Sequence, residues 1–179
     1  MANIQKKYIG LLGGSFDPAH KGHLGISKIA LKKLKLKQIY WVITKKNPFK
    51  NKTFYSLDER IKYAKKFTKS QKKIKIIYLD DIIKSSRIIE VINYFRKKKK
   101  INNIFFIIGS DNLIRFHKWK SWKKIVKLVK IIVFSRKGYD RKGMKSTVVK
   151  NFKNRITFIN NDPISISSTQ LKKRIKLNI

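Results

Sequence analysis

The 179-residue sequence contains no cysteine and only three prolines. Without cysteine the chain can form neither a disulfide framework nor a thiolate zinc site, and a reducing compartment is compatible with it. Long apolar runs are also missing: the run at residues 8–12 is far too short for a signal-peptide core or a membrane span. We therefore expect a soluble cytoplasmic protein with no membrane partner.

Acidic residues are scarce: nine Asp and Glu face 46 Lys and Arg, a formal charge of +37. Such a field attracts nucleic acid non-specifically, so a basic nucleic-acid-binding module is one candidate class. The lysines are spread along the whole chain, however, and Lys, Ile and Asn are the residues that an AT-rich genome encodes. We therefore expect no specific nucleic-acid partner, and we interpret the basic run 96–100 as the end of a helix followed by a loop.

The hydrophobic fraction of 42% and the aromatic fraction of 12% argue against a disordered chain, and the length fits one domain over residues 1–179. Apolar runs alternate with helical patterns. The strands are expected at 8–12, 39–43, 74–79, 104–108, 131–134 and 156–159. Helices are expected near 56–67, where Ser56 and Glu59 form a capping box, and near 86–95, 122–129 and 169–177. The alternation predicts an α/β fold, a Rossmann-like doubly wound parallel sheet, with ligands outside the carboxyl ends of the strands.

Between the first strand and the next apolar helix lies the string Gly-Gly-Ser-Phe-Asp-Pro-Ala-His-Lys-Gly-His, residues 13–23. Glycines let the backbone approach a ligand, and the N–H groups at a helix start attract anions, so the string suits phosphate binding. His20 and His23 fall on neighbouring positions at the start of one helix and add side-chain donors.

This string resembles the HxGH motif of the nucleotidyltransferase superfamily, which holds ATP and activates its α-phosphate. His20, Gly22 and His23 fill the motif without a mismatch. The resemblance implies that ATP is a substrate and that His20 and His23 are the catalytic residues. The ATP-binding residues that it implies here are Gly13, Gly14, Ser15, Phe16, Gly22 and His23.

A second string, Ile-Ser-Ser-Thr-Gln-Leu-Lys-Lys-Arg at residues 166–174, places hydroxyl groups before a basic helix, which is either an ordinary N-cap or an anion site. It resembles the superfamily's second motif, Ile-Ser-Ser-Thr-x-Ile-Arg, which grips the ATP phosphates. Lys172 stands at the arginine position and keeps the charge but not the bidentate fork. The resemblance adds Ser167, Ser168, Thr169 and Lys172 to the ATP-binding set.

A third string, Phe-Ile-Ile-Gly-Ser-Asp-Asn-Leu at residues 106–113, is followed by two tryptophans. Asp111 comes after a buried strand, where a carboxylate can accept hydrogen bonds from ribose hydroxyls. Trp119 offers a flat face for an electron-poor ring, although a core position is the other interpretation and the better one for Trp122. The string resembles a block of the bacterial nicotinate-nucleotide adenylyltransferases, which implies that Gly109 and Asp111 bind ATP and that Trp119 binds the acceptor.

Further segments agree with that family: residues 47–50 resemble its substrate-gating loop, and residues 134–139 resemble its Arg-Pro-Gly-Tyr segment. Where the family carries Ser-Tyr-Thr to receive the nicotinate carboxylate, this chain has Ser-Ser-Arg at 85–87. An arginine at a helix start is unfavourable to the helix dipole, so Arg87 is either compositional drift or a direct reader of the carboxylate. The substrate-binding residues implied are Asp17, Asn47, Lys50, Ser86, Arg87, Trp119 and Arg136.

The function implied by the resemblance is transfer of AMP from ATP to nicotinate mononucleotide, with pyrophosphate as the leaving group. The mononucleotide phosphate attacks the α-phosphorus directly, so catalysis is positioning plus electrostatic stabilisation. Mg²⁺ is expected on the nucleotide phosphates with mostly water ligands, without a protein metal site. A phosphopantetheine or glycerol-phosphate nucleotidyltransferase, a basic nucleic-acid-binding module and an inactive relative stay open, as does the oligomeric state.

Overall fold

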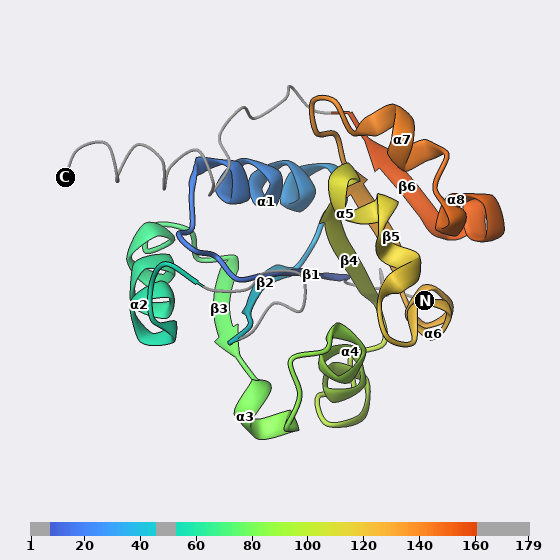
Figure 1. Ribbon diagram of the computed structural model, residues 1–179. Coiled ribbons are helices and arrows are strands. Elements are labelled where there is room, and N and C mark those ends of the chain that lie inside the picture. The colour runs from blue at the N-terminus through green and yellow to red at the C-terminus, as the bar shows by residue number, and fades with distance from the viewer. Residues whose placement is uncertain (1–7, 46–52, 161–179) are drawn as a thin grey trace, which may run out of the picture.

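The structure is a computed structural model that describes residues 8–45 and 53–160. Six strands form one sheet in the order β3-β2-β1-β4-β5-β6, and all neighbours are parallel (Figure 1). The strands are β1 (Ile9–Gly14), β2 (Gln38–Ile43), β3 (Ile74–Tyr78), β4 (Ile104–Gly109), β5 (Lys130–Phe134) and β6 (Ile156–Ile159). The expected Rossmann-like parallel sheet is therefore confirmed.

Helices connect the strands and cover the sheet on both faces. They are α1 (Lys21–Lys33), α2 (Leu57–Phe67), α3 (Asp80–Ile83), α4 (Ile88–Lys97), α5 (Ser110–Ile114), α6 (Trp122–Leu128), α7 (Asp140–Met144) and α8 (Thr147–Phe152), with short 3₁₀ turns η1 (Phe116–Lys118) and η2 (Lys153–Arg155). In Figure 1, α1 lies above the sheet and α4 below it. The helices α3, α5, α7 and α8 were not predicted, because four to six residues are too few to show a helical period.

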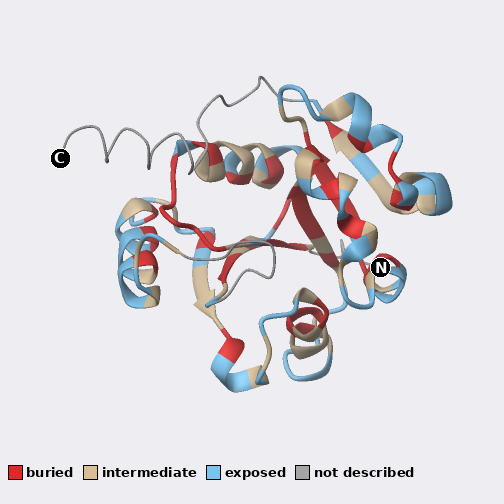
Figure 2. Cartoon of the chain, viewed as in Figure 1, coloured by how far each residue is buried: buried red, intermediate tan, exposed pale blue. Residues whose placement is uncertain are grey.

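Each face of the sheet has its own apolar core, because successive strand residues point to opposite faces. Leu11 and Phe106 belong to the core that also contains side chains of α4 and α6. Their neighbours Leu12 and Ile107 belong to the core that contains Ala30 of α1 and Ala64 of α2. Figure 2 shows the buried residues along the central strands. Burial on both faces explains why the strands are continuous apolar runs in the sequence.

The strand order reverses between β1 and β4, which are neighbours in the sheet. The helices that follow these two strands pack on opposite faces of the sheet. Ligands of such sheets bind at this reversal, outside the carboxyl ends of the strands. The sequence predicted Gly13 and Gly14 in the turn, but they are the last residues of β1, paired with Val42 and Ile43. The strand extends past the apolar run because its backbone hydrogen bonds do not require side chains.

No helix within residues 8–45 and 53–160 is both long enough and apolar enough to cross a membrane. The same ranges contain no cluster of three or more His, Asp or Glu side chains that could hold a metal ion.

Candidate active site

The turn after β1 ends in a helix cap made by the two histidines. His20 is the N-cap of α1: its Nδ1 accepts a hydrogen bond from Gly22 N at 3.1 Å. His23, at the third helical position, reciprocates, and its Nδ1 accepts from His20 N at 3.3 Å. The two rings lie together, with centroids 3.8 Å apart. The geometry is that of a capping box, with imidazoles where Ser or Thr and Glu usually stand.

This cap fixes the tautomer of each histidine. An imidazole nitrogen that accepts a hydrogen bond carries no proton, so the geometry assigns both neutral rings the Nε2–H form. Each ring therefore uses one nitrogen to hold the helix start and carries a donor on the other. The first N–H groups of α1, a helix of 13 residues, add the positive end of the helix dipole to the same place. Two imidazole donors beside a helix start favour an anion.

Aromatic packing supports the histidines from below. The ring of Phe16, which is buried, lies 4.9 Å from that of Trp41 and 4.7 Å from that of His23. Phe16 has φ +46°, a left-handed conformation that costs energy in a residue other than glycine. Trp41 Nε1 donates to Ser27 Oγ, and that hydroxyl donates to the carbonyl of His23, both at 2.8 Å. Trp41 and Ser27 could not be recognised from the sequence, because one lies in a buried strand and the other inside a helix.

The end of β1 has room beside it. A Cβ added to Gly13 would meet nothing closer than 3.8 Å, with Ile88 and Phe106 as its nearest neighbours. Packing within the described chain therefore does not demand glycine at Gly13, and the absence of a side chain there would allow a ligand to approach the backbone closely. Ile88 is the first residue of α4, so the preceding Arg87 is brought to the same edge of the sheet.

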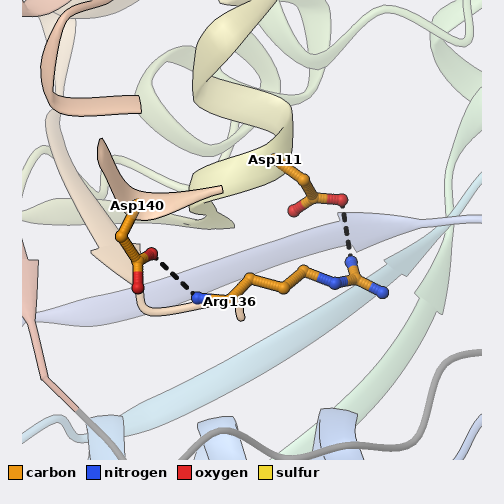
Figure 3. Close-up of polar contacts among 3 residues, drawn as sticks. All are labelled: Asp111, Arg136 and Asp140. Carbon is orange, nitrogen blue, oxygen red and sulfur yellow. Dashed lines mark hydrogen bonds and ion pairs between the residues drawn. The ribbon is translucent and has the colours of Figure 1, made fainter. Parts of the chain in front are cut away.

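A carboxylate beyond the carboxyl end of β4 meets an arginine beyond the carboxyl end of the neighbouring strand β5 (Figure 3). Arg136 Nη1 lies 2.8 Å from Asp111 Oδ2, and the two side chains are about half and one quarter exposed (43% and 25%). Among the described residues no donor reaches the buried Oδ1 of Asp111. A Cβ on Gly109 would stand 2.5 Å from this Oδ1, so glycine is needed there to admit the carboxylate. Asp111 is therefore held in place through Oδ2, and its Oδ1 is an acceptor that no donor of the described residues reaches.

Asp140 fixes the backbone from which Arg136 reaches Asp111. Its carboxylate accepts a hydrogen bond from Arg136 N at 2.9 Å (Figure 3). It also contacts the Ser135 hydroxyl. Burial alone raises the pKa of Asp140, but hydrogen bonds from the Ser135 hydroxyl and the Arg136 amide favour its charged form, and this pKa lies below its usual value. Asp140 is therefore ionised at neutral pH. Sequence reasoning missed it because its partners are backbone and hydroxyl groups.

The candidate acceptor residues lie on the β4 side and at the start of α4. The half-buried Trp119 packs on Phe116, with ring centroids 5.0 Å apart, and on Phe106 at 6.0 Å. Phe106 also borders Gly13, so Trp119 is one ring away from the end of β1. Ser86 and Arg87 are exposed, and Arg87 is the extended N-cap of α4, with its N–H donated to Ser85 Oγ at 3.2 Å.

Two candidate residues, Asp17 and Ser15, are buried and form hydrogen bonds within the protein. Asp17 is fully buried, and its carboxylate accepts from the amides of Phe54 and Tyr55 at 2.8 and 2.9 Å. Ser15 is buried as well and uses its carbonyl as an acceptor within the protein. Six candidates lie outside the described residues: Asn47, Lys50, Ser167, Ser168, Thr169 and Lys172.

This fold and this histidine-capped turn define a class of protein, and the family model of the cytidylyltransferase-like proteins matches residues 11–174. A probable nicotinate-nucleotide adenylyltransferase of Pelagibacter ubique is 51% identical over 172 residues, which cover 96% of this chain and 95% of that protein. A second, from Clostridium tetani, is 34% identical and covers 97% of this chain and 88% of its own length. The chain therefore belongs to the nicotinate-nucleotide adenylyltransferase family.

Solved structures agree on the fold. The nicotinic acid mononucleotide adenylyltransferase of Plasmodium falciparum, complexed with NaAD, superposes with a TM-score of 0.72 over 93% of this chain and 83% of its own. Its sequence identity is 18%, so this likeness concerns the fold alone.

Proposed function

We propose that this protein transfers the AMP moiety of ATP to nicotinate mononucleotide and releases pyrophosphate, a reaction of NAD biosynthesis. The observation that carries the proposal is the capping box of His20 and His23 at the start of α1, in a chain that is 51% identical to a family member over nearly its whole length. A nucleotidyl transfer needs donors that stabilise charge on the transferred phosphate, and this site offers two imidazoles and a helix start.

In the proposed reaction an oxygen of the mononucleotide 5′-phosphate forms a bond to the α-phosphorus of ATP while the bond to the β-phosphate oxygen breaks. The phosphate is already an anion, so no protein nucleophile or base is required. The protein accelerates the reaction by positioning the two substrates and by stabilising the developing charge. The Nε2–H groups of His20 and His23 donate to the phosphates as negative charge develops. The backbone at Gly13, Gly14, Ser15, Phe16 and Gly22 holds the nucleotide.

The other candidates divide between the two substrates. Ser167, Ser168, Thr169 and Lys172 bind the triphosphate, and Asp111 beside Gly109 accepts hydrogen bonds from ribose hydroxyls. Trp119 stacks on the pyridine ring, and Arg136 and Arg87 add positive charge near the acceptor. Asn47, Lys50 and Ser86 complete the acceptor site, with Asp17 shaping it through the backbone of residues 54–55. Mg²⁺ arrives with ATP, coordinated by phosphate oxygens and water.

We place the reaction in the cytoplasm, since a chain without cysteine is compatible with a reducing compartment. We also infer that residues 1–179 act as one domain, since the six strands found within residues 8–45 and 53–160 belong to one sheet. The proposal includes no specific nucleic-acid partner and no membrane partner.

The test is a pyrophosphate-release assay with ATP, Mg²⁺ and one acceptor at a time: nicotinate mononucleotide, nicotinamide mononucleotide, phosphopantetheine or glycerol phosphate. Repeating it with CTP decides the nucleotide. We expect turnover with ATP and nicotinate mononucleotide. Turnover with phosphopantetheine alone would overturn the proposal in favour of another member of the superfamily, and no turnover with any acceptor would favour an inactive relative.

A further inference from the structure

One buried arginine stands apart from the lysine-rich surface. Arg60 of α2 is only 2% exposed, although arginine is seldom buried without partners. Its Nη1 donates to the carbonyls of Ser15 at 2.7 Å and Thr44 at 2.9 Å, and its Nη2 lies 3.4 Å from the carbonyl of Lys45. Its Nε adds the carbonyl of Ser56, at 3.3 Å. A single guanidinium thus joins the turn after β1, the end of β2 and the start of its own helix.

Two buried carboxylates hold the same segments by their N–H groups. Asp17, in the turn after β1, accepts from the amides of Phe54 and Tyr55. Asp80, the first residue of α3 just after β3, is 8% exposed and accepts from Thr44 Oγ1 and Lys45 N, both at 2.9 Å. Burial lowers the pKa of Arg60, and the charges of Asp17 and Asp80 oppose this, so one buried cation is balanced by nearby carboxylates.

The orientation of one peptide links this arrangement to the proposed reaction. A trans peptide is planar, so its carbonyl and the following N–H point in opposite directions. Because Arg60 binds the Ser15 carbonyl, the N–H of Phe16 faces away from α2. Phe16 is the residue held at φ +46° whose ring packs against His23. Losing the Ser15 hydrogen bond therefore frees a strained peptide beside the histidine cap.

We propose that Arg60 is a positioning residue: by binding the carbonyls of Ser15, Thr44 and Lys45 it sets the phosphate-binding turn after β1 against the segment after β2. It touches no substrate. A guanidinium does this because its donors form a planar fork, whereas a lysine ammonium is a point charge that cannot reach three carbonyls in the same geometry. This inference rests on the proposed function, in that the turn is taken as the nucleotide site.

The test compares Arg60→Lys with Arg155→Lys as a matched control. Arg155 also binds two backbone carbonyls, those of Val126 at 3.0 Å and Lys127 at 3.1 Å, but it joins η2 to α6, away from the site. Both variants keep their charge and lose the fork. Each is assayed at a temperature well below its own unfolding midpoint, so that all of the protein is folded.

For Arg60→Lys we expect the Kd for MgATP, measured by calorimetry, to rise about tenfold. We expect kcat/KM for the mononucleotide to fall about 10- to 100-fold, because a small displacement of reacting groups lowers the rate by such factors. For Arg155→Lys we expect both quantities to stay at wild-type values even if the unfolding midpoint falls. If Arg60→Lys, fully folded, keeps wild-type Kd and kcat/KM, the positioning role is overturned and Arg60 is a stabilising residue only.

Two further results keep the test decisive. If Arg60→Lys does not fold, Thr44→Val removes the hydroxyl that donates to Asp80 and keeps the Thr44 carbonyl that Arg60 binds. A rise in the Kd for MgATP of about fivefold supports the network, and an unchanged Kd overturns it. If the wild type binds ATP but turns over no nicotinate mononucleotide, the proposed function fails, while the Kd comparison still decides the role of Arg60.

Discussion

The capping box of His20 and His23 implies that the two ring nitrogens of His20 have different roles, which can be tested separately. Nδ1 accepts from Gly22 N and stabilises the start of α1, and Nε2–H is assigned to phosphate binding. Asparagine places an oxygen at the position of Nδ1 and is among the best N-cap residues, but it has no group at the position of Nε2. Glutamine places an N–H₂ group near the position of Nε2 but caps poorly. The pair His20→Asn and His20→Gln therefore separates the two roles.

The expected magnitudes differ enough to be measured. Loss of one donor to a developing charge costs about 10² to 10³ in kcat, so His20→Asn should fold normally and turn over at that reduced rate. Loss of an N-cap costs about 1 kcal/mol, which is about 2–4 °C in the unfolding midpoint of a chain of this length. His20→Gln should show that fall in midpoint and a smaller loss of kcat, and His20→Ala should show both losses.

The assay is initial-rate pyrophosphate release with saturating ATP and nicotinate mononucleotide, together with thermal unfolding followed by circular dichroism. Wild-type kcat in His20→Asn would refute the reasoning, because the cap would then account for everything that His20 does. A second contrary result would be a loss of kcat in His20→Gln that exceeds the loss in His20→Asn.

Three other predictions concern the acceptor and the surface charge. Trp119→Ala should raise the KM for the mononucleotide by the equivalent of about 1–3 kcal/mol of stacking and leave the KM for ATP nearly unchanged, with Trp122→Ala as the control; the opposite pattern would assign Trp119 to the core. Arg87→Ala should shrink the preference for nicotinate over nicotinamide mononucleotide about tenfold, or about 1.4 kcal/mol, whereas Arg96→Ala, in the last turn of α4, should not; an unchanged preference would make Arg87 a surface residue. Binding to nucleic acid should be indifferent to sequence and should weaken steeply with salt; a preference for one sequence at physiological salt would revive the binding-module hypothesis.

The sequence was sufficient for the sheet because each strand is a run of apolar residues long enough to be buried on both faces. It also showed the start of α2, where Ser56 and Glu59 form the expected capping box. It did not show the capping role of His20, since histidine is not a usual cap residue and its spacing from His23 first suggested a ligand site. The sequence motif identified His20 and His23 as candidate site residues. The structure was needed to show that Nδ1 of each ring accepts a backbone hydrogen bond at the helix start.

Contacts between distant segments were beyond the sequence for a different reason. Arg136 meets Asp111 across 25 positions, and the pairing follows from β4 and β5 being neighbours in the sheet. Arg60 lies in an amphipathic helix whose other basic residues are solvated, so nothing in the pattern marks its burial. A single arginine among many lysines is distinguished by its surroundings, which become visible only when the turn after β1 and the end of β2 are placed against α2.

The scarcity of acidic residues, which at first indicated only compositional bias, becomes informative once they are placed. Of the nine in the sequence, seven accept a hydrogen bond or pair with an arginine in the described part of the chain: Asp17, Glu59, Asp80, Asp81, Glu90, Asp111 and Asp140. Four of them, Asp17, Asp80, Asp111 and Asp140, lie at or just beyond the carboxyl ends of strands of the sheet, where they bind backbone amides or hold an arginine. Lysine cannot accept a hydrogen bond, so these positions cannot follow the bias of the surface. These four carboxylates therefore hold the segments around the candidate site in place, whereas most of the excess positive charge lies on the solvent-exposed surface.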